Sequence, residues 1–131
     1  MPLTAFTRDD DTAEFLDAAG RGEFLVRRCE LGHVSEPAAE SCTTCLAVPL
    51  QWVAASGRAR LISWAVTYTP GADGEQEANV LAIGELEEGP WWWSCIPGAD
   101  PETLNVNDPL VVAFEKPADT EETLPVFRLA R

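Results

Sequence analysis

One short segment of this chain, between residues 29 and 45, carries a cysteine and histidine spacing that restricts the fold more than any other feature. Cys42 and Cys45 form a Cys-x2-Cys pair, and they follow Cys29 and His33, the single histidine of the chain. A Cys-x2-Cys turn directs two thiolates to one point, and zinc prefers four soft or borderline ligands in a tetrahedron. The spacing therefore predicts a rubredoxin-like zinc ribbon with Cys29, His33, Cys42 and Cys45 as ligands.

The first half of this predicted site is irregular. Gly32 occupies the position three residues after Cys29, where a second cysteine is usual, and His33 stands next to it. The alternative interpretation is that His33 is a surface loop residue and that the metal site is incomplete. Four protein ligands leave no position for an activated water, so the predicted zinc is structural. Iron prefers four thiolates in such a ribbon, so the histidine disfavours a redox site.

The expected compartment supports metal ligation over disulfide formation. Residues 1–10 lack the basic and then apolar plan of a signal peptide, and the chain has no run of about 18 apolar residues that would span a membrane. We therefore expect a cytoplasmic protein whose closely spaced thiols stay reduced and bind metal. Cys95 lies apart in an apolar run, which is typical of a small buried side chain.

The residues outside this segment predict a mainly β chain. Residues 9–20 begin with acids and end at a glycine, which indicates a short helix with Phe15, Ala18 and Ala19 on its apolar face. Residues 23–28 predict a strand that leads into Cys29. After it, runs rich in β-branched and aromatic residues alternate with turn sequences; the runs are 50–56, 60–68, 79–86, 91–96, 110–115 and 125–129.

Five or six short strands fit a small OB-type barrel better than a sandwich, which usually needs seven or more. We therefore expect three parts in this 131-residue chain. They are an N-terminal helical segment at 1–22, a zinc ribbon at 23–49, and a five- to six-stranded OB-fold barrel at 50–131.

The charge balance restricts the partners and the chemistry. Nine Lys and Arg against 22 Asp and Glu give a formal net charge of −13. Nucleic acid is therefore not an expected partner, because its phosphates are bound by clustered Lys and Arg. With one histidine in the chain, a Ser-His-Asp or Cys-His arrangement is difficult to build, so we expect no catalytic residue and no catalytic role for Cys95.

Three consecutive tryptophans, Trp91, Trp92 and Trp93, lie in one predicted strand. Alternation along a strand places two of the rings on one face and the third on the other, so at least one indole should be exposed. The acidic background favours use of these aromatics as anchors for a protein partner, and the alternative is core packing with partial exposure. The helix is a second candidate for the partner interface through Phe15, because a helix this short needs packing.

In their order along the chain, several motifs resemble a known family. The motifs are Phe15-x-x-Ala18-x-x-Arg21-Gly22 before Arg28-Cys29, Gly32-His33 and Pro37 before Cys42-x2-Cys45, Trp52-Val53-x-x-Ser56-Gly57-Arg58-Ala59, Ala82-Ile83-Gly84-Glu85-Leu86-x-Glu88-Gly89-Pro90, Asp108-Pro109-Leu110-Val111-Val112, and Thr123-Leu124-Pro125-Val126-Phe127-Arg128. Together they resemble the OB-fold acyl-CoA-associated family with an N-terminal zinc ribbon, called domain of unknown function thirty-five.

This resemblance implies a non-catalytic accessory subunit of a thiolase-like, acyltransferase, or steroid aldolase or hydratase complex. It implies that the chain helps to bind a CoA thioester and the partner enzyme, with zinc as a structural cofactor. The runner-up function is a stand-alone zinc-ribbon OB module that binds single-stranded nucleic acid or another ligand. The net charge disfavours the nucleic acid.

Overall fold

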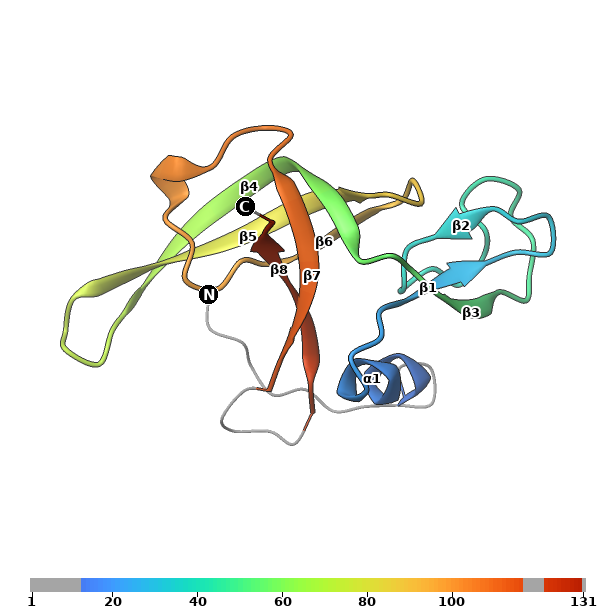
Figure 1. Cartoon of the computed structure of the whole chain (residues 1–131), viewed down its shortest axis with the longest axis horizontal. Helices are drawn as coiled ribbons and strands as arrows, with labels where there is room; N and C mark the ends of the chain where they lie inside the picture. The colour runs from blue at the N-terminus through green and yellow to red at the C-terminus, as the bar shows by residue number, and fades with distance from the viewer. Residues whose placement is uncertain (1–12, 117–121, 131) are drawn as a thin grey trace.

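A computed structural model describes residues 13–116 and 122–130 as two sheets flanked by one short helix (Figure 1). The elements are α1 Ala13–Gly20, β1 Leu25–Arg28, β2 Val34–Ser35, β3 Gln51–Ala54, β4 Arg58–Pro70, β5 Gln76–Leu86, β6 Trp91–Cys95, the 3₁₀ turn η1 Pro101–Thr103, β7 Pro109–Glu115 and β8 Leu124–Leu129. Strands β1 to β3 and their connecting loops form one lobe, which we call the ribbon lobe. The other five strands form a barrel.

The ribbon lobe contains a three-stranded antiparallel sheet in the order β2-β1-β3. The strand predicted at residues 50–56 exists as β3, but it pairs with β1, from Leu25 opposite Ala54 to Arg28 opposite Gln51. The strand that we expected to open the barrel thus lies in the ribbon sheet. The physical reason is that side-chain alternation identifies a strand but carries no information about which sheet it joins.

The barrel is a five-stranded sheet in the order β6-β5-β4-β7-β8, with every neighbouring pair antiparallel. Strand β4 pairs with β5 along its length and with β7 at its start, and a register shift between Leu61 and Ser63 bends it. Strands β6 and β8 approach each other at the two ends of the sheet, where Ser94 Oγ donates to the Pro125 carbonyl at 3.0 Å. The barrel is thus nearly closed, and the mainly β prediction is confirmed.

The barrel core extends into the ribbon lobe. Phe127 is fully buried at its centre, and Phe24 and Val26, on the way into and within β1, belong to the same hydrophobic cluster. Gly84 lies directly beside the Phe127 ring, because a Cβ there would lie 2.7 Å from Phe127 Cζ. A shared core of this kind fixes the ribbon lobe to the barrel.

Helix α1 covers the base of the ribbon lobe (Figure 1). Of the predicted apolar face, Ala18 and Ala19 are buried and Phe15 is half-buried, and Leu16, which the prediction did not include, is also buried. Glu14 and Asp17 are exposed. The predicted acidic start of this helix at residues 9–11 lies outside the described residues. No helix in the described part of the chain is long and apolar enough to cross a membrane.

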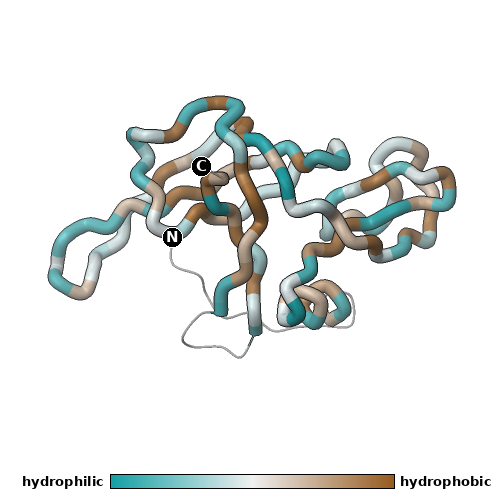
Figure 2. Tube along the Cα trace, in the orientation of Figure 1, coloured by the Kyte–Doolittle hydropathy of each residue, from teal (hydrophilic) through white to brown (hydrophobic). Residues whose placement is uncertain are grey.

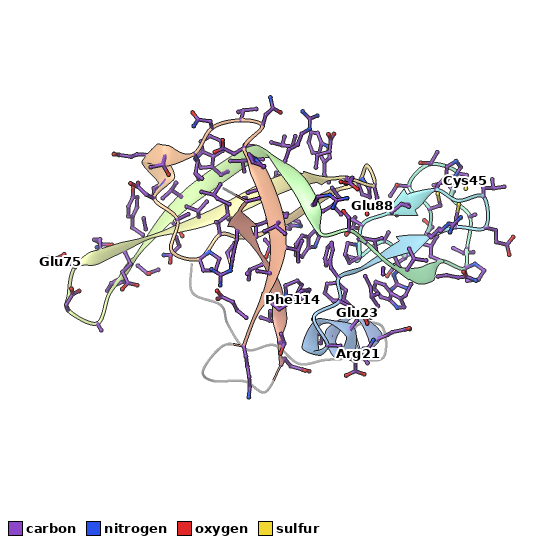
Figure 3. All side chains as sticks on the ribbon, viewed as in Figure 1. Arg21, Glu23, Cys45, Glu75, Glu88 and Phe114 are labelled. Carbon is purple, nitrogen blue, oxygen red and sulfur yellow. The ribbon has the colours of Figure 1, made fainter. Side chains whose placement is uncertain are left out.

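The β4–β5 hairpin projects from the end of the barrel opposite the ribbon lobe, and its tip is hydrophilic (Figure 2). On the other side of the barrel, the turn between β5 and β6 reaches the link between β3 and β4. There, Glu88 Oε2 accepts the backbone N–H of Ser56 at 2.8 Å (Figure 3). This hydrogen bond adds a polar contact to the apolar junction between the two lobes.

Candidate metal centre and aromatic groove

All four predicted metal ligands meet in the ribbon lobe, and Figure 3 shows Cys45 at the end of the lobe remote from the barrel. Their ligand atoms all lie within 4.8 Å of one another. Cys29 Sγ lies 3.4 Å from His33 Nδ1 and 3.8 Å from Cys45 Sγ. In a zinc tetrahedron with Zn–S bonds of about 2.3 Å, two sulfur atoms lie about 3.8 Å apart. The donor set and its spacing therefore fit a tetrahedral metal ion.

The first turn of this cluster, at residues 29–33, contains Gly32 where a second cysteine is usual. The Gly32 N–H donates to the Cys29 carbonyl at 3.0 Å, and the Cys29 N–H donates to the His33 carbonyl at 3.0 Å. Gly32 has a φ of +91°, a left-handed conformation that favours glycine. The next residue, His33, is half-buried and carries a side chain long enough to return to the cluster.

The second turn stabilises a thiolate. Cys42 Sγ accepts the backbone N–H groups of Cys45 and Thr44, each at 3.4 Å. The Cys45 N–H, followed by the Thr44 N–H, lowers the pKa of Cys42 to about 6 against the opposing effect of burial. The N–H of Ala47 lowers the pKa of Cys45, but the Cys42 thiol, loss of hydration and Cys29 outweigh it, so that pKa is raised. Backbone donors thus prepare one anionic ligand before a metal arrives.

Cys95 lies outside this cluster, in the barrel. Its side chain is buried, and burial raises the pKa of its thiol. The one imidazole of the chain belongs to His33 in the ribbon lobe, so the thiol has no adjacent histidine base. The prediction of a small buried side chain at this position is confirmed.

The three consecutive tryptophans divide between the two faces of β6. Trp91 and Trp93 are 56% and 65% exposed, whereas Trp92 is half-buried and packs against Phe127 at 5.2 Å between ring centroids. The Trp91 indole N–H donates to Glu85 at 3.2 Å. The Arg60 guanidinium, and then this indole, lower the pKa of the Glu85 carboxyl. The prediction of at least one exposed indole is confirmed, and its hydrogen bond holds Trp91 in a defined orientation.

Sequence reasoning missed a groove of about 660 Å³ between α1, the ribbon lobe and the barrel. Phe15, Trp52 and Trp92 line it together with Arg27 and the loops at 37–40 and 48–50. The Arg27 guanidinium lies 3.6 Å from the Trp52 ring centroid, and Arg27 Nε donates to the Pro37 carbonyl at 3.2 Å. Arg27 and Trp52 face each other across β1 and β3, a pairing that only the fold reveals.

Two further contacts organise this groove. Trp52 stacks on Phe15 with ring centroids 5.8 Å apart, and Phe24 lies 4.7 Å from Trp92. Phe15 and Trp92, which the sequence nominated for a partner interface, are therefore half-buried against other rings. The groove combines flat aromatic walls with the Arg27 guanidinium, which forms no ion pair within the described residues, and with the acidic side chain of Glu40. This lining suits a ligand that has a flat ring and places an anionic group beside Arg27.

Comparisons with known proteins agree with this architecture. Residues 52–115 match a family described as the C-terminal OB-fold domain of ChsH2. The 3-oxo-4,17-pregnadiene-20-carboxyl-CoA hydratase alpha subunit of Mycobacterium tuberculosis is 31% identical over 104 residues, which are 79% of this chain. The chain spans only 33% of the length of that relative.

Two solved structures are similar over nearly the whole chain. The Ltp2-ChsH2(DUF35) aldolase contains a chain with a TM-score of 0.79 and 27% identity, and the match covers 97% of this chain and 100% of that one. A protein of unknown function from the DUF35 family of Sulfolobus solfataricus has a TM-score of 0.62 and 13% identity, over 92% of this chain and 85% of its own. The second likeness shows a common fold alone.

Proposed function

Because residues 52–115 of this chain belong to the ChsH2 C-terminal OB-fold family, we propose that the protein is a non-catalytic accessory subunit of an acyl-CoA-processing complex. The main support is the similarity to the chain of the Ltp2-ChsH2 aldolase, which extends over the full length of that chain. The proposed partner is a thiolase-like aldolase subunit or a hydratase subunit, in the cytoplasm. The buried Cys95 and the single histidine within the metal cluster support a role without catalysis.

We also propose that the cofactor is one structural zinc ion held by Cys29, His33, Cys42 and Cys45. When bound, zinc would cross-link the two turns of the ribbon lobe and would have no open position for a reacting water. The support is the donor set and the spacing of its ligand atoms. In this role the metal shapes the lobe and takes no part in a reaction.

The aromatic groove is the proposed contact of this chain with the CoA thioester. CoA carries a flat adenine ring, phosphates and a narrow pantetheine arm, and the groove offers stacked rings beside the Arg27 guanidinium. The net charge of the chain is −13 and would repel an anionic ligand. The positive charge of Arg27 is therefore the proposed source of attraction for such a ligand in the groove. Trp91 and Trp93 are the proposed anchors for the partner enzyme, because both indoles are exposed on β6.

The test combines the purified chain with an Ltp2-type thiolase-like subunit from the same organism and measures turnover of a steroid acyl-CoA. We expect turnover with both proteins present and none with this chain alone. An Arg27→Met variant should raise KM for the acyl-CoA severalfold with little change in kcat, whereas Arg128→Met, whose partner Glu115 lies in the barrel, should change neither. Turnover by the isolated chain that Cys95→Ala abolishes would contradict the proposal.

The exposed Trp91 and Trp93 on an OB barrel favour one second candidate, a module that binds single-stranded nucleic acid. Retention of the chain on single-stranded DNA at low salt, lost at high salt and lost in Trp93→Ala, would support it. The acidic charge predicts no retention.

A further inference from the structure

The turns around the metal cluster expose large apolar side chains. Leu31 in the first turn is 74% exposed, Leu46 directly after Cys45 is 76% exposed, and Val48 is 67% exposed. We call these three residues the knuckle patch. Leu31 and Leu46 lie within two residues of side chains whose ligand atoms are within 4.8 Å of one another, so they occupy the same end of the ribbon lobe. Figure 2 shows hydrophobic segments at that end, far from the barrel.

Leu46 is unfavourable for the isolated chain in two respects. Its φ of +63° is left-handed, a conformation in which a glycine is more stable than a side chain with a Cβ. The first turn also contains a left-handed residue, and there it is a glycine, Gly32, with a φ of +91°. In addition, the Leu46 side chain lies outside the hydrophobic core cluster and faces solvent. Two backbone hydrogen bonds hold this turn, from the Leu46 N–H to the Cys42 carbonyl at 2.9 Å and from the Cys42 N–H to the Ala47 carbonyl at 3.0 Å. Neither bond uses the Leu46 side chain, whose exposure is consistent with a contact outside the chain.

The charges around the knuckle patch restrict what can cover it. Between residues 29 and 57 the charged residues are three glutamates, Glu30, Glu36 and Glu40. The exposed Arg28 guanidinium also lies beside the first turn, because its Nη2 atom would be 3.6 Å from a Cβ at Gly32. Glu30 and Glu40 are exposed, and Glu36 is half-buried. The three glutamates outnumber this arginine, so the surroundings of the patch carry a net negative charge. They disfavour an anionic membrane surface or a nucleic acid and favour an apolar hollow bordered by Lys and Arg on a protein.

We propose that the knuckle patch docks into an apolar hollow, bordered by Lys and Arg, on the catalytic subunit of the acyl-CoA-processing complex. This inference rests on the proposed function and adds a contact separate from the exposed tryptophans of β6. Leu46 is the main anchor in this proposal, because its side chain is the most exposed of the three. Val48 joins the patch to the aromatic groove, which it also lines. The docked subunit would therefore cover one side of the groove opening.

The decisive variant is Leu46→Gly, because it separates docking from folding. Glycine adopts the left-handed backbone more readily and removes a side chain that is 76% exposed and lies outside the core cluster of the described residues. We expect the variant to keep its metal and to resist urea at least as well as wild type, while the Kd for an Ltp2-type thiolase-like subunit rises tenfold or more by calorimetry. Leu31→Ser should raise the same Kd, and Glu30→Gln should slow association and reduce its salt dependence.

Val106→Ser is the matched control, because Val106 is 60% exposed in the loop after η1, outside the ribbon lobe. The Kd of this variant for the thiolase-like subunit should equal that of wild type. Wild-type affinity in both Leu46→Gly and Leu31→Ser would overturn this inference and leave the proposed function intact. Loss of metal or stability in Leu46→Gly would assign the side chain to the lobe itself and overturn it as well. Self-association of wild type that Leu46→Gly abolishes would assign the patch to a second copy instead. A wild-type chain that binds no such subunit overturns both proposals.

Discussion

At the scale of single residues, Gly84 shows how closely the barrel core is packed. A Cβ at this position would lie 2.7 Å from Cζ of Phe127 and 3.2 and 3.3 Å from two further ring atoms. The Phe127 ring is fully buried and packs against Trp92, so it has little room to move. Glycine is therefore required at position 84 because the Phe127 ring leaves no space for a Cβ. It is not required by a left-handed backbone conformation.

We predict that Gly84→Ala destabilises the folded chain by about 1 to 3 kcal/mol, the usual cost of overpacking a core. Urea denaturation followed by tryptophan fluorescence measures the change in the free energy of unfolding. Gly20→Ala is the control, because a Cβ at Gly20 meets no atom within 4 Å. Equal stability of the two variants would show that the Phe127 ring shifts freely.

The same scale shows what the sequence alone can predict about the candidate site. The four ligands follow from spacing, because cysteine and histidine at these intervals have few other uses in a reduced protein. The groove could not be predicted, because Arg27 and Trp52 are far apart in sequence and meet only through the pairing of β1 with β3. The exposure of Leu46 was missed for a similar reason, since it depends on the sign of one backbone angle.

At the scale of elements, the ribbon lobe has little backbone support of its own. Strand β2 pairs with β1 through two residues, and the long connection from β2 to β3 contains no strand. The barrel strands, in contrast, pair over long stretches, with β4 and β5 joined from Ala59 opposite Leu86 to Pro70 opposite Gln76. The existence of the barrel strands was predictable from the turn sequences that separate them. The sheet that β3 joins was not predictable, because alternation is the same in either sheet.

We therefore predict that Cys42→Ser loses the metal and unfolds the ribbon loops locally while the barrel persists. Structural zinc contributes about 10 to 16 kcal/mol in isolated finger peptides, which is large compared with the few hydrogen bonds of this lobe. Metal analysis and amide hydrogen exchange measure both effects, and residues 29–50 should exchange much faster than β4 and β5. Cys95→Ser is the control and should retain one zinc. Stoichiometric zinc in Cys42→Ser with unchanged exchange would refute the ligand assignment.

At the scale of the whole molecule, a row of aromatic rings joins the two lobes. Phe15 contacts both Trp52 and Phe24, Phe24 contacts Trp92, and Trp92 contacts Phe127 in the barrel core. The centroids of neighbouring rings lie 4.7 to 6.0 Å apart, within the range of favourable aromatic pairs. The row passes from the ribbon sheet through the helix into the barrel, so helix and lobes are expected to unfold together.

We predict that Phe24→Ala interrupts this row and destabilises the chain by about 3 to 5 kcal/mol, the usual cost for a buried phenylalanine. Calorimetry should then resolve separate transitions for the ribbon lobe and the barrel, with the zinc still bound because the cluster is untouched. Phe114→Ala, at a half-buried position of β7, should cost less and keep a single transition. A single sharp transition in Phe24→Ala would mean that the row does not couple the lobes.

The packing between the two lobes also fixes the distance between the two ends of the molecule. The ribbon lobe, which carries the knuckle patch, and the β4–β5 hairpin lie at opposite ends of the molecule (Figure 1), and a shared hydrophobic core lies between them. A partner that binds both ends must contact two surfaces at a fixed separation. The second contact then forms at a high effective concentration only if the two binding sites of the partner have the same separation. The chain would then discriminate between partner complexes by the distance between their binding sites as well as by the chemistry of those sites.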